Sequence, residues 1–320
     1  MEILDLRHFR SADLRSLMEE EGAVWSRELD WDYGPSAEMI LRYLDARILP
    51  GYAAVEEGNL AGYTFFVYEG SKGIIGDLFV RQTAAQATAN GAQSLGERLL
   101  GHVIETLQNS PGIHRIEAQL LPHPAGALAR PFTQGGFARH PRLFMNLALS
   151  QAREWAAPGR PKAAEIELRP WSDTAFNAAA AVIAAAYRDH VDADINDQYR
   201  TMSGSLRFLN NIVRFPGCGV FDPGSSRVAV HKASKTAVGL ILCSRVKEGV
   251  GHVTQVCVVP EHRGTGTGAA LVAASAANLE SRGFQTLSLT VTEANTRAVE
   301  LYRRLKFEQS KVFDAFVWEG

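Results

Sequence analysis

Cysteine is scarce in this sequence of 320 residues, and its spacing is irregular. The three cysteines are Cys218, Cys243 and Cys257, which include no CxxC pair and are odd in number. This usage argues against both a disulfide framework and a zinc site. We therefore expect no bound metal, and reduced thiols fit a cytoplasmic protein.

Long apolar runs are also missing. The longest, Ala178–Tyr187, is rich in alanine and too short to span a bilayer. The first residues, "MEILDLRHFRSADLRS", carry acidic side chains and lack the apolar core of a secretory signal. The sequence therefore predicts a soluble intracellular protein that does not associate with membranes.

A surplus of positive charge is absent as well. Lys and Arg total 33 against 35 Asp and Glu, which gives a formal net charge of −2 at pH 7. Proteins that bind a nucleic-acid backbone neutralise its phosphates with basic side chains. We expect no nucleic-acid partner, and a local basic site for one small phosphate stays open.

The sequence does contain enough apolar residues, 46%, for more than one ordinary domain. Residues 150–165 hold Pro158, Gly159 and Pro161 without a sustained apolar period, as a linker does. We predict a first domain at 1–150, a linker at 151–164 and a second domain at 165–320.

The two halves begin and end alike. A strand at 2–7 precedes a helix that starts at Ser11, and a strand at 165–169 precedes a helix capped by Ser172 or Asp173. Each half ends in a Phe-rich strand. This pattern predicts duplication of one unit. The fold class is α/β (α+β), with a mixed twisted sheet flanked by helices in each half.

A glycine-rich stretch follows an apolar strand in the second half, "VCVVPEHRGTGTGAAL". Gly264, Gly266 and Gly268 alternate after Arg263, and a helix is expected from about 268 to 282. A phosphate loop of the GxxxxGK[ST] type is excluded, and a GxGxxG fingerprint needs glycine where Ala269 stands. A turn without a ligand is the remaining alternative. The glycines, the arginine and the helix start together favour an anion site.

Two segments carry a resemblance to a known family. The glycine stretch resembles motif A of the Gcn5-related N-acetyltransferases (GNAT), and "TVTEANTRAVELYRRLKF" resembles motif B. In motif B, Lys306 departs from the usual glycine before Phe307. The order and spacing of both motifs are similar to the family over residues 165–320. The resemblance implies tandem GNAT-like domains, with acetyl-CoA as co-substrate.

The resemblance also implies a set of cofactor-binding residues. The loop and helix start would hold the pyrophosphate, and a splayed strand would pair with the pantetheine arm. The implied residues are Val256, Cys257, Val258, Arg263, Gly264, Thr265, Gly266, Thr267, Gly268, Asn295, Ala298 and Tyr302.

Catalytic residues follow from the same resemblance. Tyr302 would give a proton to the departing thiolate, and the amide of Val258 would donate to the developing oxyanion. His252 stands where some members have a glutamate base, and its strand parity with Val256 and Val258 predicts the same face. Glu293, acting through water, is the alternative base. A packed tyrosine and a capped or solvated histidine are the structural alternatives.

The first half lacks these motifs. A strand at Ile74–Val80 and a helix near 94–107 enclose a loop without alternating glycines. Gly136 and Phe137 resemble the end of motif B, but the tyrosine is missing upstream. We predict a degenerate GNAT-like domain there.

The resulting hypothesis is N-acetylation of a primary amine by direct attack in a ternary complex. A non-catalytic acyl-CoA-binding or sensing protein is the alternative. The acceptor is a small-molecule or peptide amine. The acidic residues of 189–200 and the aromatic and acidic segment 28–36 would suit such an amine, but an ordinary solvated loop is the favoured interpretation of both segments. The chain would act as a monomer or homodimer.

Overall fold

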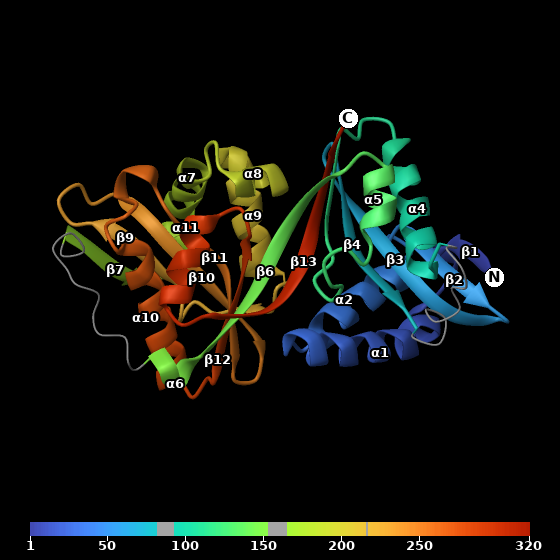
Figure 1. Cartoon of the computed structure of the whole chain (residues 1–320), viewed down its shortest axis with the longest axis horizontal. Coiled ribbons are helices and arrows are strands. Elements are labelled where there is room, and N and C mark those ends of the chain that lie inside the picture. The colour runs from blue at the N-terminus through green and yellow to red at the C-terminus, as the bar shows by residue number, and fades with distance from the viewer. Residues whose placement is uncertain (82–92, 153–164, 216) are drawn as a thin grey trace. The chain divides into compact units, whose positions relative to one another are not determined.

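The structure, a computed structural model, describes residues 1–81, 93–152, 165–215 and 217–320. These residues form two compact units (Figure 1). Unit 1 comprises Met1–Pro141 and Val312–Gly320, and unit 2 comprises Arg142–Lys311. The predicted linker at 151–164 lies outside the described residues apart from its first two.

Unit 1 contains a mixed sheet, and among its described strands β4 and β5 form the parallel pair. Its strand order is β1 (Glu2–Asp5), β2 (Gly51–Glu56), β3 (Asn59–Glu69), β4 (Lys72–Val80), β5 (Arg115–Gln119) and the end of β13 (Glu308–Glu319). One apolar cluster packs α1 (Ser11–Leu29) and α2 (Gly34–Asp45) against the sheet. Another packs α4 (Leu95–Gln108) and α5 (Ala129–Gln134) against it.

Unit 2 repeats this plan. Its strand order is β6 (Ala138–Ala148), β12 (Thr286–Thr292), β11 (Val250–Val258), β10 (Ala237–Lys247), β9 (Arg227–His231) and β7 (Ile166–Pro170), with β8 (Val220–Phe221) beside β10. Again one pair, β11 and β12, is parallel. The helices are α6 (Leu149–Ala152), α7 (Phe176–Ala186), α8 (Val191–Ile195), α9 (Met202–Arg214), α10 (Thr267–Ser281) and α11 (Thr296–Arg304).

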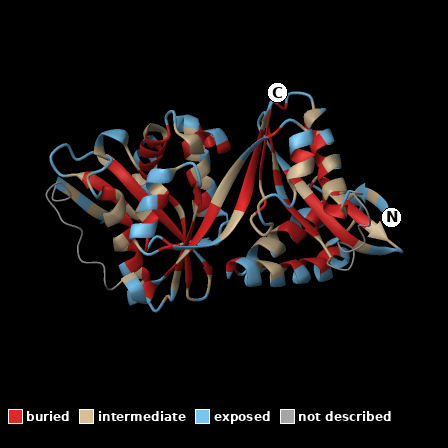
Figure 2. Ribbon diagram, in the orientation of Figure 1, coloured by how far each residue is buried: buried red, intermediate tan, exposed pale blue. Residues whose placement is uncertain are grey.

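The helices of unit 2 cover both faces of its sheet, and the buried residues concentrate on the strands between them (Figure 2). Successive residues of β10 point to opposite faces of the sheet. Leu240 and Leu242 pack with α7 and α9, whereas Gly239 faces Leu271 of α10. The predicted α/β fold class, a mixed sheet flanked by helices in tandem, is confirmed.

The division predicted at 150 and 165 does not separate the two sheets. The strand that ends each half, β6 or β13, pairs in the sheet of the other half. Residues 142–148 of β6 pair with β12 in unit 2, and residues 315–319 of β13 pair with β5 in unit 1. Each Phe-rich strand therefore completes the other half's sheet. Linear sequence reasoning assigns a strand to its neighbours in the chain, so it does not predict this exchange.

Both units share a bulge at the same point. In unit 2 the parallel pairing stops at Val253, and Thr254 is an extra residue opposite β10. In unit 1 the parallel pairing stops at Ile75, and Gly76 is the extra residue opposite β3. A bulge bends its strand and ends the regular pairing. The sheet of each unit therefore opens beyond the bulge.

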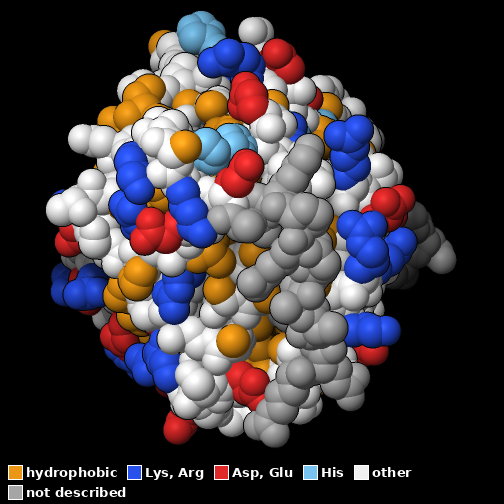
Figure 3. All heavy atoms as spheres, turned by 90° about the vertical axis from the view of Figure 1, so that its left-hand side faces the viewer, with side chains coloured by type: hydrophobic (Ala, Val, Ile, Leu, Met, Phe, Trp, Pro, Cys, Tyr) orange, Lys and Arg blue, Asp and Glu red, His pale blue; other side chains and the backbone are white. Residues whose placement is uncertain are grey.

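On the face that Figure 3 shows, Lys and Arg side chains alternate with Asp and Glu. Within the described ranges, no helix has the length and apolar character needed to cross a bilayer. The same residues include no group of three or more His, Cys, Asp or Glu suited to a metal ion.

Candidate active site

The opened end of β11 provides a polar backbone edge. From Thr254 to Val258 the described pairing of β11 is with β10 alone, so its other edge no longer meets β12. An extended amide-bearing ligand can add to such an edge. The predicted pantetheine positions, Val256, Cys257 and Val258, lie in this segment.

The glycine loop leads from this strand into α10. Gly264 and Gly266 have φ values of 73° and 88°, the left-handed region that glycine adopts without strain. A Cβ at either position would meet no atom within 4 Å, so the space beside the loop is open. Gly266 is the N-cap of α10, and no described side chain caps that end. The first N–H groups of α10 and its dipole therefore suit an anion.

The other loop residues shape this turn. The Thr265 hydroxyl donates to the carbonyl of His262 at 2.8 Å and lies 2.8 Å from the hydroxyl of the buried Thr267. The exposed Arg263 donates through Nε to the Val258 carbonyl at 3.1 Å and through Nη2 to the Ala186 carbonyl. Arg263 thus joins the end of β11 to the end of α7 and keeps a positive charge at the loop.

Tyr302 lies on α11 and is buried, with its ring edge-on to Phe307 at 5.7 Å. Burial raises the pKa of Tyr302 above its ordinary value, and the charges of Asp192 and Cys257 raise it further. The phenol therefore keeps its proton at neutral pH. A protonated hydroxyl in this position meets the first requirement of a proton donor.

Two predicted cofactor residues have an observed structural contact. The Asn295 side chain caps α11 by accepting from the amide of Ala298 at 3.3 Å. This cap fixes the helix that carries Tyr302. At the other end, Lys306 has a φ of 64°, which explains why glycine is usual before the phenylalanine.

The two predicted bases lie in different environments. His252 is buried, its Nδ1 lies 2.9 Å from the Ser288 hydroxyl, and its ring stacks on Phe144. Burial, reinforced by Arg142, lowers the pKa of His252 to about 3, so the imidazole is neutral. Glu293 is exposed just after β12.

The predicted shared face of His252, Val256 and Val258 is wrong. Gly251 faces Leu279 of α10, so His252 faces the opposite side. The bulge at Thr254 then reverses the alternation, and Val258 approaches Gly268, the second residue of α10. A one-residue bulge leaves no signal in a strand's apolar pattern, which is why parity misplaced these side chains.

Several polar residues that the sequence did not single out converge on the same region. The Tyr187 hydroxyl donates to Gln255 Oε1 at 3.0 Å and approaches the Val256 carbonyl at 3.4 Å. The Thr292 hydroxyl donates to Asp192 of α8. Asp192 is one of the acidic residues of 189–200, but its inward position depends on where α8 packs and could not be read from composition.

Cys257 lies among these groups without the features of a nucleophile. Its side chain packs in the apolar cluster with Tyr187 and Leu240. Burial raises the pKa of Cys257 to about 12, so the thiol is not ionised at neutral pH. Since the thiolate is the reactive form, we assign Cys257 to the core.

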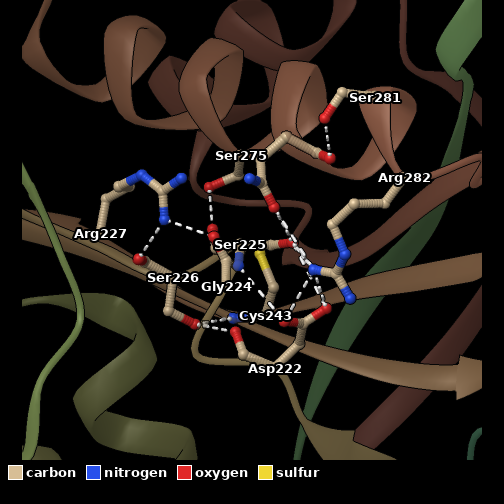
Figure 4. Close-up of polar contacts among 10 residues, drawn as sticks. Asp222, Gly224, Ser225, Ser226, Arg227, Cys243, Ser275, Ser281 and Arg282 are labelled. Carbon is tan, nitrogen blue, oxygen red and sulfur yellow. Dashed lines mark hydrogen bonds and ion pairs between the residues drawn. The ribbon is translucent and has the colours of Figure 1, made fainter.

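A polar cluster holds the far end of α10 on the sheet (Figure 4). Arg282 Nη1 donates to both oxygens of the buried Asp222, at 2.9 and 2.7 Å. Ser275 of α10 donates to the Ser225 carbonyl at 2.6 Å, and Ser226 accepts from the amide of Cys243 on β10. These contacts fix the axis of the helix whose other end is the glycine loop.

Unit 1 has the same framework with different end groups. Ser94 caps α4 and Glu97 completes a capping box, so the first amides have partners and a carboxylate lies in the first turn. His123 contacts the Leu78 carbonyl beyond the bulge of β4 at 3.0 Å. The counterpart of Tyr302 is Phe132, which lacks a hydroxyl. This match rests on the same backbone hydrogen bond at the end of each helix, donated by the amide of the residue five positions later. The Phe137 amide donates to the Phe132 carbonyl at 3.0 Å, and the Phe307 amide donates to the Tyr302 carbonyl at 2.9 Å.

The family match falls within unit 2, whereas the named relatives cover most of the chain. Residues 190–307 match the acetyltransferase (GNAT) family. The mycothiol acetyltransferase of Thermobispora bispora is 29% identical over 290 residues, covering 86% of this chain and 81% of that protein. The mycothiol acetyltransferase of Saccharomonospora viridis is 29% identical over 318 residues, covering 89% and 95%.

Solved structures share the fold over nearly the whole chain. A GCN5-related N-acetyltransferase from Sphaerobacter thermophilus has a TM-score of 0.67 at 20% identity, covering 99% of this chain and 95% of that one. A tandem GNAT protein from the clavulanic acid biosynthesis pathway has a TM-score of 0.56 at 16% identity, covering 99% and 98%. At these identities the likeness concerns the fold.

Proposed function

We propose that the chain is a member of the GNAT superfamily of acetyltransferases and that unit 2 moves the acetyl group of acetyl-CoA to a primary amine. The observation that carries this proposal is the joint presence, in one unit, of an opened strand edge, an uncapped glycine helix start and a protonated tyrosine. In unit 1 the corresponding places hold a capped helix start and a phenylalanine.

The residues of unit 2 fit the chemical groups of acetyl-CoA. The open space at Gly264 and Gly266 and the free amides of α10 suit its pyrophosphate, with Arg263 and the hydroxyls of Thr265 and Thr267 beside them. The edge of β11 beyond Thr254 suits the amides of the pantetheine arm. Acetyl-CoA supplies an activated acyl group.

In the proposed reaction the neutral acceptor amine attacks the acyl carbon, so a C–N bond forms and the C–S bond breaks. The Val258 amide donates to the carbonyl oxygen as negative charge develops there. Tyr302 gives its phenolic proton to the departing sulfur and regains one from solvent. The surplus proton of the amine leaves to water, with the exposed Glu293 as the proposed acceptor.

His252 has a different proposed role. A neutral imidazole with a pKa of about 3 is a poor proton acceptor at physiological pH. Its contacts with Ser288 and Phe144 link β11 to β12 and β6 where the parallel pair is still closed. We propose that His252 fixes β11 just before the bulge at Thr254, where the strand still pairs with β12, and that Glu293 serves as the base.

The relatives suggest a first acceptor. Both are named mycothiol acetyltransferases and cover most of this chain, so we propose the deacetylated form of mycothiol as the first amine to assay. An amine panel with 2-phenylethylamine, cadaverine and amino-acid amides follows if that compound is not acetylated.

The test is steady-state release of CoA thiol with acetyl-CoA and these amines. Because a general acid contributes at least roughly a hundredfold, Tyr302→Phe is expected to lower kcat by that factor with acetyl-CoA affinity retained. Glu293→Gln is expected to lower kcat less and His252→Gln to lower the midpoint of thermal unfolding. Binding of acetyl-CoA without turnover of any amine would favour the sensing alternative.

A further inference from the structure

The acidic segment before β8 holds one inward-facing carboxylate. Among Asp189, Asp192, Asp194 and Asp197, Asp192 has a side chain only 16% exposed, whereas that of Asp194 is 65% exposed. Asp192 lies in the first turn of α8, between the end of α7 and α9. Its carboxylate therefore belongs to the interior of unit 2 rather than to a solvated loop.

The contacts of Asp192 leave one oxygen available. Oδ1 accepts from the Thr292 hydroxyl at the end of β12, and Oδ2 lies 3.6 Å from His190 Nδ1. That nitrogen already accepts the amide N–H of Asp192 at 3.2 Å. Burial lowers the pKa of His190. The charge of Asp192 opposes this shift and the charge of Arg263 adds to it, and the net pKa is below the ordinary value, so the ring is neutral at pH 7. Within the described residues, no Lys or Arg forms an ion pair with Asp192.

Asp192 also lies near the acid of the proposed reaction. Its charge contributes to the raised pKa of Tyr302 on α11, of Tyr187 on α7 and of Tyr199 in the 3-10 turn Asp197–Arg200. The charged or titratable groups that act on the same side chains as Asp192 are Cys257, Asp194, Arg142 and Arg263. The carboxylate lies beside the groups that meet at the opened edge of β11.

We propose that Asp192 binds the ammonium group of the acceptor, so that this chain selects amines that are cationic at neutral pH. The proposal rests on the proposed function. The Asp192 side chain is largely shielded from water, and no Lys or Arg among the described residues is paired with it, so an ammonium donating to Oδ2 gains a charge-assisted hydrogen bond. The ammonium must lose one proton before attack, and the neighbouring carboxylate makes that loss harder.

This second effect gives a signature that a merely structural residue would not produce. Because Asp192 stabilises the ammonium in the complex, kcat rises with pH at a higher midpoint than it would without the charge. Asp192→Asn keeps the shape and the contact with Thr292. It is expected to raise KM for the amine at least roughly tenfold and to lower the midpoint of the kcat–pH profile by about one unit.

One variant serves as the control. Asp194→Asn removes the same charge from the exposed position two residues away. We expect it to keep KM for the amine within roughly threefold of the wild-type value, and both variants to keep KM for acetyl-CoA.

The assay uses deacetylated mycothiol and 2-phenylethylamine as acceptors with the full chain. The expected split between Asp192→Asn and Asp194→Asn supports the proposal. If Asp192→Asn matches Asp194→Asn in KM and pH midpoint, the ammonium role is wrong while the proposed function stands. Failure of the wild-type protein to acetylate either amine or any member of the panel would overturn both.

Discussion

The side chains of Tyr302 and Phe132 differ by one hydroxyl group, and the proposed proton transfer depends on that group. Both close a short helix with the same backbone bond, and both pack edge-on to the phenylalanine that follows, at 5.7 and 5.2 Å. The framework is therefore independent of the hydroxyl. What distinguishes the two positions is a buried, protonated oxygen in unit 2 that can give a proton.

Lys306 offers a stability prediction at the residue scale. It occupies the left-handed region at φ 64°, where its counterpart in unit 1 is Gly136 at φ 79°. A side chain there strains the backbone, so Lys306→Gly is expected to stabilise the protein by about 0.5–1 kcal/mol in urea unfolding. The reciprocal change, Gly136→Lys, is expected to destabilise it by about 1 kcal/mol. Destabilisation by Lys306→Gly, or no loss of stability in Gly136→Lys, would contradict the assignment of strain.

The packing of α1 in unit 1 depends on a pair of buried acids. Glu21 of α1 accepts from the Tyr63 hydroxyl and from Trp25 Nε1, and Asp77 of β4 accepts from the Tyr33 hydroxyl at 2.9 Å. Burial raises the pKa of both carboxyl groups, and each acts on the other. We infer that the pair holds a shared proton to a higher pH in the folded state than in the unfolded chain.

This shared proton predicts a pH dependence. A pKa raised by folding stabilises the folded state fully below the unfolded value, and that stability is lost as pH rises through the folded value. Unfolding free energy should fall by up to about 1.4 kcal/mol per pH unit above pH 5. Glu21→Gln should flatten this slope, and the exposed Glu19→Gln should leave it unchanged. Urea unfolding from pH 5 to 8 measures the slopes, and parallel curves for Glu21→Gln and wild type would refute the shared proton.

The elements that the sequence revealed are those with local signals. The glycine stretch and the helix that it opens follow from residue types at fixed spacing, and the structure places that helix at 267–281. The bulge at Thr254 and the exchange of β6 and β13 have no local signal. They arise from pairing between strands far apart in the chain, so the orientation of His252 and the inward position of Asp192 could not be predicted.

At the scale of the whole molecule, the two units share one framework and differ at its functional ends. The helix start after the opened strand is uncapped in α10, whereas in α4 it is capped and carries Glu97. A carboxylate at a helix N-terminus occupies the position that favours a phosphate and repels it. The account therefore requires a single acetyl-CoA per chain, held by unit 2.

The most direct measurement is a calorimetric titration of the chain with acetyl-CoA. The wild-type protein should bind one equivalent, and Gly266→Glu should abolish binding because its carboxylate enters the open space beside the loop. The matched control is Gly101→Glu on α4, where a Cβ also meets no atom within 4 Å, and it should bind like wild type. Thermal unfolding checks that both variants fold. Two equivalents per chain, or one that survives in a folded Gly266→Glu, would contradict the account.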